Sequence, residues 1–180
     1  MKADYIALFR GINVGGKNSL TMKALVRMLE ENGYTRVQTY IQSGNVIFQS
    51  TSAKAEVLAR IIGRAIASKY GFQPGIVVLS AQELNKAAAA NPFPKAEAES
   101  KSLHLYFLSQ APKDPDLEAL NRLKSDNESF KLIGDVFYLH APDGIGRSKL
   151  APRVEKLLDV ETTARNWNTV TKLLEMMHAR

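Results

Sequence analysis

The stretch that decides the fold is Tyr5-Ile6-Ala7-Leu8-Phe9-Arg10, followed by Gly11-Ile12-Asn13-Val14-Gly15-Gly16-Lys17-Asn18. The first part is an apolar run of strand length, and a helical pattern begins shortly after the second part. Glycines let a backbone approach a ligand closely, and the free N–H groups at a helix start favour an anion. The stretch therefore predicts a buried strand, a glycine-rich loop and a helix, with a candidate anion site at the loop.

The rest of the first half predicts a split βαβ unit. Thr21 is a good N-cap residue, and Ser43-Gly44 is typical of a tight turn between two strands. The expected elements after the loop are a helix at 21–32, strands at 37–41 and 45–49, a helix at 53–70 and a strand at 76–79. This order is that of a ferredoxin-like fold, in which the first and third strands are antiparallel central neighbours. The glycine loop, the first helix start and the Gln42–Asn45 turn then share one sheet edge.

The second half repeats this order in part. Asn91-Pro92-Phe93-Pro94 ends a short helix, and residues 95–101 are charged and poor in apolar side chains, so the predicted domains are 1–94 and 95–180. The expected elements are a strand at 102–108, a helix at 115–124, hairpin strands at 130–133 and 136–140, and a helix at 148–158. The last strand is expected to be missing or replaced by a final helix at 168–177. The predicted fold class is α+β: two tandem ferredoxin-like halves with antiparallel sheets, plus C-terminal helices.

Composition limits the chemistry. The chain has 180 residues and no cysteine, which excludes disulfides, thiolate metal ligands and cysteine nucleophiles. His104, His140 and His178 lack metal-ligand spacing, so neither a metal nor a cofactor is expected. The net charge of +6 permits an anionic ligand or nucleic acid. No signal-peptide shape or membrane-spanning run occurs, so a cytoplasmic protein without a membrane partner is expected.

Three motifs together resemble a known family. They are Ala7-Leu8-Phe9-Arg10-Gly11-Ile12-Asn13-Val14-Gly15-Gly16-Lys17-Asn18, Thr39-Tyr40-Ile41-Gln42-Ser43-Gly44-Asn45-Val46 and Thr163-Ala164-Arg165-Asn166-Trp167-Asn168-Thr169-Val170. The chain is similar over nearly its whole length to the mostly bacterial family catalogued as domain of unknown function 1697. The resemblance implies a cytoplasmic α+β protein of two ferredoxin-like halves. It implies no established activity and no assigned catalytic residues.

The glycine loop is close to the phosphate-binding pattern G-x-x-x-x-G-K-[ST], but Asn18 replaces the hydroxyl residue that would ligate Mg²⁺. A nucleotide-hydrolysing loop is therefore not expected. Two interpretations stay open. In one, Lys17 and the loop bind a bare anion or a phosphate ester. In the other, the glycines only satisfy the backbone geometry and Lys17 is solvated.

Similar alternatives apply to the other polar motifs. Gln42-Ser43-Gly44-Asn45 is either turn chemistry or part of a site beside Arg10. Arg165-Asn166-Trp167-Asn168-Thr169 is either a capped helix entry around a buried Trp167 or an arginine with two amides aimed at a ligand. Gly144-Ile145-Gly146-Arg147-Ser148-Lys149 is either an ordinary helix entry or a second basic loop.

The functional hypothesis is a polar, basic cleft that binds a small anionic or phosphorylated ligand. The candidate ligand-binding residues are Arg10, Asn13, Lys17, Ser43, Asn45, Arg147, Lys149, Arg165 and Asn168. A nucleic-acid-binding protein is the first alternative, although no aromatic RNA-binding signature occurs on the central strands. The second alternative is an enzyme using the same cleft, for which the sequence offers no evident general base. The sequence does not predict the oligomeric state.

Overall fold

The computed structural model describes residues 2–16, 18–51 and 54–180. The chain forms two compact units, one made of Met1–Asn85 together with Leu173–Arg180 and the other of Lys86–Lys172. The divisions fall inside two helices, α3 (Ala81–Ala89) and α6 (Trp167–His178). Because of the second division, the end of the chain belongs to the same unit as its beginning.

The first unit is a split βαβ fold. Its elements are β1 (Ala3–Arg10), α1 (Met22–Glu31), β2 (Thr35–Tyr40), β3 (Asn45–Ser50), α2 (Ala55–Tyr70) and β4 (Gly75–Ser80). The sheet order is β2-β3-β1-β4, and every pairing is antiparallel. The predicted pairing of the first and third strands at the centre is therefore confirmed.

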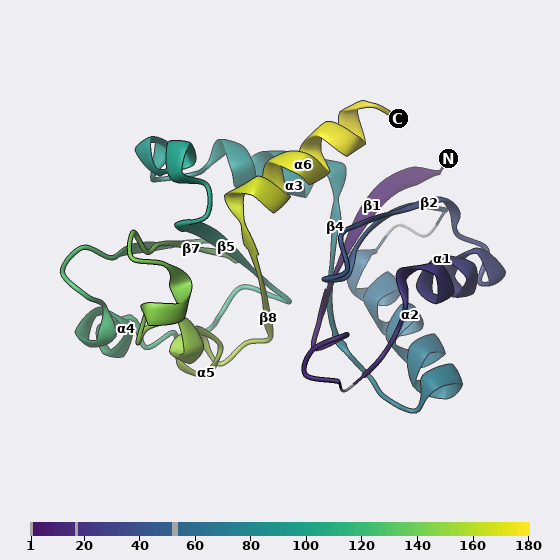
Figure 1. Cartoon of the computed structure of the whole chain (residues 1–180), viewed down its shortest axis with the longest axis horizontal. Helices are drawn as coiled ribbons and strands as arrows, with labels where there is room; N and C mark the ends of the chain where they lie inside the picture. The colour runs from purple at the N-terminus through teal and green to yellow at the C-terminus, as the bar shows by residue number, and fades with distance from the viewer. Residues whose placement is uncertain (1, 17, 52–53) are drawn as a thin grey trace. The chain divides into compact units, whose positions relative to one another are not determined.

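The two helices of the first unit cover one face of its sheet (Figure 1). Tyr5, Phe9 and Phe48 project from the central strands into a core that includes Leu25 of α1 and Ile62 of α2. The α1 helix starts as expected, because the Thr21 hydroxyl accepts a hydrogen bond from the backbone N–H of Ala24 at 3.2 Å. This packing fixes the start of α1 and the end of α2 at the sheet edge where β1 ends.

The second unit has the same strand order. Its elements are the 3₁₀ helix η1 (Pro94–Glu99), β5 (Leu103–Leu108), α4 (Leu117–Leu123), β6 (Ser129–Ile133), β7 (Val136–His140), the 3₁₀ turns η2 (Ile145–Arg147) and η3 (Ala151–Arg153), α5 (Val154–Leu158) and β8 (Thr162–Asn166). The sheet order is β6-β7-β5-β8, again antiparallel throughout. The predicted α+β class with two similar halves is therefore confirmed.

Two expectations about the second half are wrong. Its last strand is present: β8 pairs with β5 and completes the sheet, and α6 follows it as an additional element. The helix expected at 148–158 is only the five-residue α5, preceded by the 3₁₀ turn η3. Pro152 lies in that turn and has no N–H to donate, which favours a late helix start. The helix ends at Asp159, which adopts a left-handed backbone with φ 50°.

Candidate functional site

The glycine loop is closed by hydrogen bonds of its own. The backbone N–H of Asn13 donates to the carbonyl of Asn18 at 3.1 Å, and the Asn18 side-chain amide donates to the carbonyl of Gly11 at 2.9 Å. Gly15 and Gly16 have positive φ, and a Cβ added to either would meet no atom within 4 Å. These glycines are therefore required by the backbone conformation and leave open space beside the loop.

Asn13 ties the loop to the segment that precedes α1. Its side-chain oxygen accepts from the backbone N–H of Leu20 at 2.8 Å, and its Nδ2 donates to the Leu20 carbonyl at 2.7 Å. A second donation from Nδ2 reaches the Gln42 carbonyl at 3.4 Å. Since Leu20 is buried, this candidate residue anchors the loop to the core of the first unit.

The turn between β2 and β3 lies directly against the loop. The backbone N–H of Phe9 donates to the Gly44 carbonyl at 2.8 Å. Asn45 is fully buried, and its Nδ2 donates to the Tyr40 carbonyl at 3.1 Å and to the Ser43 hydroxyl at 3.0 Å. The structure thus brings the loop and the turn together, and these amide contacts stabilise the turn.

Arg10 is the exposed last residue of β1, and its strand neighbour is Gly75 at the start of β4. A Cβ added to Gly75 would lie 3.3 Å from Arg10 Nε, so the arginine side chain passes over that glycine. Lys17 lies outside the described residues. The first-unit candidates Arg10, Asn13, Ser43 and Asn45 therefore all lie at one end of the β1–β3 pair.

The other four candidates belong to the second unit. Arg147, Lys149 and Asn168 are exposed. Arg165 is half-buried on β8, where burial lowers the pKa of its guanidinium to about 10 and Nη1 donates to the Ala164 carbonyl at 2.8 Å. The cap of α6 comes from Asn166, whose Oδ1 accepts from the Thr169 N–H at 3.0 Å. The capping interpretation of this motif is thereby supported for Asn166.

A basic pocket between α1 and α2 was not predicted from the sequence. It has a volume of about 450 Å³ and is lined by Thr21, Lys23, Ala24, Arg27, Lys69 and Tyr70. Three of these six residues carry a positive charge, from two helices that are distant in the sequence. The i, i+4 spacing of Lys23 and Arg27 on α1 was a usable signal, but the approach of Lys69 depends on helix packing.

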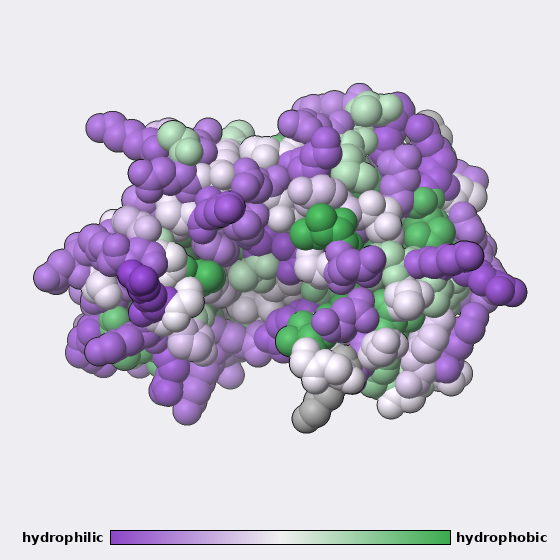
Figure 2. Space-filling model, viewed as in Figure 1, coloured by the Kyte–Doolittle hydropathy of each residue, from purple (hydrophilic) through white to green (hydrophobic). Residues whose placement is uncertain are grey.

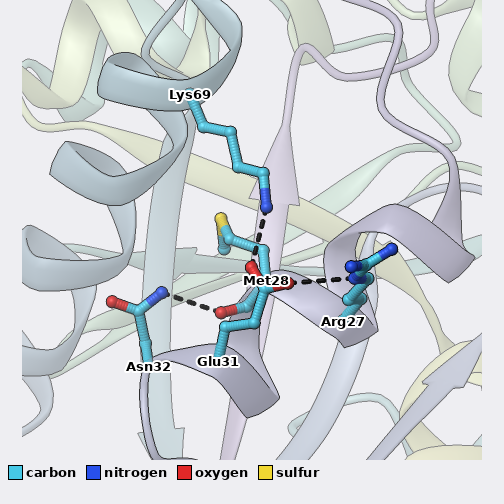
Figure 3. Close-up of polar contacts among 5 residues, drawn as sticks. All are labelled: Arg27, Met28, Glu31, Asn32 and Lys69. Carbon is cyan, nitrogen blue, oxygen red and sulfur yellow. Dashed lines mark hydrogen bonds and ion pairs between the residues drawn. The ribbon is translucent and has the colours of Figure 1, made fainter.

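Glu31 connects two of these cations (Figure 3). Its carboxylate accepts from Lys69 Nζ at 2.8 Å and from Arg27 Nε at 2.9 Å, and Asn32 closes the same end of α1 by donating to the Met28 carbonyl. Hydrogen bonds from Lys69 and Arg27 lower the pKa of the Glu31 carboxyl. All three charged side chains remain 46% exposed or more, so a dissolved anion can compete with Glu31 for them.

Most of the net positive charge of the chain belongs to the first unit. That unit contains 11 Lys and Arg residues against 6 Asp and Glu, a net charge of +5, whereas the second unit has 13 against 12. The face in Figure 2 is mostly hydrophilic, and its hydrophobic residues appear as separate spots. The charge asymmetry therefore favours an anionic partner for the first unit.

Among the residues the structure describes, no group of three or more histidine, aspartate or glutamate side chains could hold a metal ion. Within the same residues, no helix is both long and apolar enough to span a membrane.

Two split βαβ units with antiparallel sheets define an α+β protein of ferredoxin-like architecture, with a basic pocket in its first unit. The chain belongs to the family described as protein of unknown function (DUF1697), whose model matches residues 1–138. A solved structure, that of the conserved bacterial protein SP0830 from Streptococcus pneumoniae, has the same fold, with a TM-score of 0.72 and 23% sequence identity over 98% of this chain and 99% of that one. A comparison with curated proteins found no match.

Proposed function

We propose that the protein binds a small anionic or phosphorylated ligand at the basic end of its first unit, in the cytoplasm. The observation that carries the proposal is the pocket of about 450 Å³ lined by Lys23, Arg27 and Lys69. Its volume is within the range of small-ligand sites, and three ammonium or guanidinium groups at one opening suit a phosphate ester. The start of α1 adds partial positive charge from its free N–H groups.

Glu31 acts as an internal competitor in this proposal. It holds Lys69 and Arg27 in place while the pocket is empty, and a bound phosphate replaces one of its carboxylate oxygens as the acceptor. Removing its charge should therefore strengthen anion binding, whereas removing the cations should weaken it. These opposite effects distinguish a ligand pocket from a purely structural ion network.

The glycine loop is proposed to contribute to anion binding at the basic end of the first unit. Arg10 adds positive charge beside the loop, while Asn13 and Asn45 stabilise the loop and the turn. Ser43 is exposed in the turn and offers its hydroxyl to a ligand. Arg147, Lys149, Arg165 and Asn168 of the second unit stay candidate ligand-binding residues, but they do not line the basic pocket of the first unit.

Calorimetric titration with adenosine 5′-monophosphate and with inorganic phosphate tests the proposal. The double variant Lys23→Gln/Lys69→Gln should raise the Kd for both probes about tenfold, and Glu31→Gln should lower it. Arg60→Gln/Arg64→Gln is the matched control, because it removes the same charge from exposed positions on α2 outside the pocket. Equal effects of the two double variants, or no binding of either probe, contradict the proposal.

Nucleic acid remains the alternative partner, and salt dependence separates it from a small ligand. Ile6, Leu8 and Ile47 of the central strands are aliphatic and fully buried, so they provide no surface for base stacking. A small phosphate ester should give a shallow dependence of Kd on salt. A steep dependence with oligonucleotides would favour nucleic acid instead.

A further inference from the structure

A second pocket lies in the other unit, along η1. It has a volume of about 600 Å³ and is lined by residues that include Pro92, Phe93, Pro94, Lys95, Glu99 and His140. A neighbouring hollow of about 340 Å³ shares Glu99 and Pro142 with it. None of the residues in the functional hypothesis lines either hollow, so this feature is independent of the anion site.

The apolar part of this pocket contains two rings set apart from each other. The ring centroids of Phe93 and His140 are 6.2 Å apart and the ring planes are inclined by 36°, with both side chains half-buried. Their exposed faces and edges can contact a third ring, since offset and edge-to-face arrangements over this distance range are favourable. A flat aromatic group is therefore the best occupant of this part.

The segment that carries Phe93 is held in place before any ligand arrives. The Phe93 N–H donates to Asn91 Oδ1 at 3.0 Å, and Asn91 Nδ2 donates to Glu97 Oε1 at 2.8 Å. Pro92 and Pro94 restrict the backbone on both sides of Phe93. A preorganised ring loses little conformational freedom on binding, which favours a specific contact.

The polar part of the pocket carries one charge of each sign. Lys95 and Glu99 are both exposed on η1, and among the described residues neither side chain takes part in an ion pair or a side-chain hydrogen bond. A carboxylate and an ammonium group at the rim of an aromatic pocket match a ligand with the opposite pair of charges. A ligand that carries only one charge would leave either Lys95 or Glu99 without a counter-charge.

We propose that this pocket binds an aromatic α-amino acid, with its ring against Phe93 and His140, its ammonium group on Glu99 and its carboxylate on Lys95. A ligand of this size with three contacts should bind with a Kd of about 1 mM. The site requires no contribution from the first unit.

The experiment is calorimetric titration of the full chain with L-phenylalanine, phenethylamine and 3-phenylpropionate. The last two probes keep the ring but lack the carboxylate and the ammonium group, respectively. Each should bind about tenfold more weakly than L-phenylalanine. Glu99→Gln should weaken L-phenylalanine and phenethylamine but not 3-phenylpropionate, and Lys95→Gln should weaken L-phenylalanine and 3-phenylpropionate but not phenethylamine.

Phe93→Ala should weaken all three probes, because each of them places a ring against Phe93. If that variant melts earlier than the wild type, Phe93→Leu keeps apolar volume and still removes the ring. Matched controls in the same unit are Glu118→Gln, Lys131→Gln and Leu117→Ala, which change exposed residues outside the pocket. The proposal is overturned if L-phenylalanine does not bind, if 3-phenylpropionate alone binds, or if the pocket variants behave like their controls.

Discussion

Gly44 and Phe9 are in backbone contact where the turn between β2 and β3 meets the end of β1. The Phe9 N–H donates to the Gly44 carbonyl at 2.8 Å, and a Cβ added to Gly44 would lie 2.6 Å from the Cβ of Phe9 and 2.7 Å from Ile12 Cδ1. Gly44 also has φ 76°. Only glycine fits this position, because the backbone is left-handed and the neighbouring side chains leave no room for a Cβ atom.

Gly44→Ala should therefore destabilise the protein by about 3 kcal/mol or more, combining left-handed backbone strain with a clash against the core. Gly134→Ala is the control: φ there is +60°, but an added Cβ meets nothing within 4 Å. That variant should cost only about 1 kcal/mol. Denaturant unfolding of both variants measures the difference, and equal losses would show that space at Gly44 is unimportant.

Trp167 begins α6 and is 8% exposed, as expected from the apolar residues that follow it at helical spacing. Trp167→Ala should lower the free energy of unfolding by about 3–5 kcal/mol, the usual cost of removing a large aromatic ring from a core. Urea melts monitored by far-UV circular dichroism give the value without tryptophan fluorescence. A loss below about 1 kcal/mol would contradict the burial of this ring.

His104 should make stability fall in mild acid. It lies buried on β5, its Nδ1 has no hydrogen-bond partner among the described residues, and burial lowers the pKa of its imidazole, with a weaker opposing effect from the Ser102 backbone. The unfolded chain then binds a proton first, so stability decreases as the pH falls below about 6.5. His104→Leu should reduce the change in the urea midpoint between about pH 7 and pH 5. The control variant His178→Leu, at an exposed position, should leave this change as it is in the wild type.

Arg180 and Asp4 form an ion pair in the first unit, with Nε 3.1 Å from Oδ1 and the arginine side chain only 4% exposed. Arg180 Nη2 also donates to the Arg36 carbonyl at 2.6 Å. Asp4→Asn should lower the free energy of unfolding by about 1–3 kcal/mol, because it leaves a buried guanidinium without its counter-charge. The partial exposure of Asp4 keeps this loss moderate. The double variant Asp4→Asn/Arg180→Met should recover part of this loss in a double-mutant cycle.

The fold was predictable where local signals and packing agree. The α1 helix follows its Thr21 cap, and the central strands are apolar enough to be recognised. The edge strand β8 was missed because Thr162, Thr163, Arg165 and Asn166 lack an alternating apolar pattern, and its pairing with β5 is a tertiary effect. The predicted extension of β2 to Ile41 also exceeded the strand, since Ile41 has φ 50° and belongs to the turn.

The candidate site was predictable only in part. Chain order and crossover handedness were enough to predict that the Gly44 turn lies beside the glycine loop. The hydrogen bonds of Asn13 with Leu20, by contrast, depend on how the loop closes. The basic pocket needs Lys69 to approach α1 from a helix some forty residues further along, and no local pattern contains that information.

The discontinuity of the first unit has a consequence for biosynthesis. A ribosome releases β1 to β4 long before it makes Leu173–Arg180, yet these last residues belong to the same unit. The second unit, with its strands β5 to β8, is synthesised in between. The nascent first unit therefore gains the contact between Arg180 and Asp4 only after the whole second unit has been synthesised.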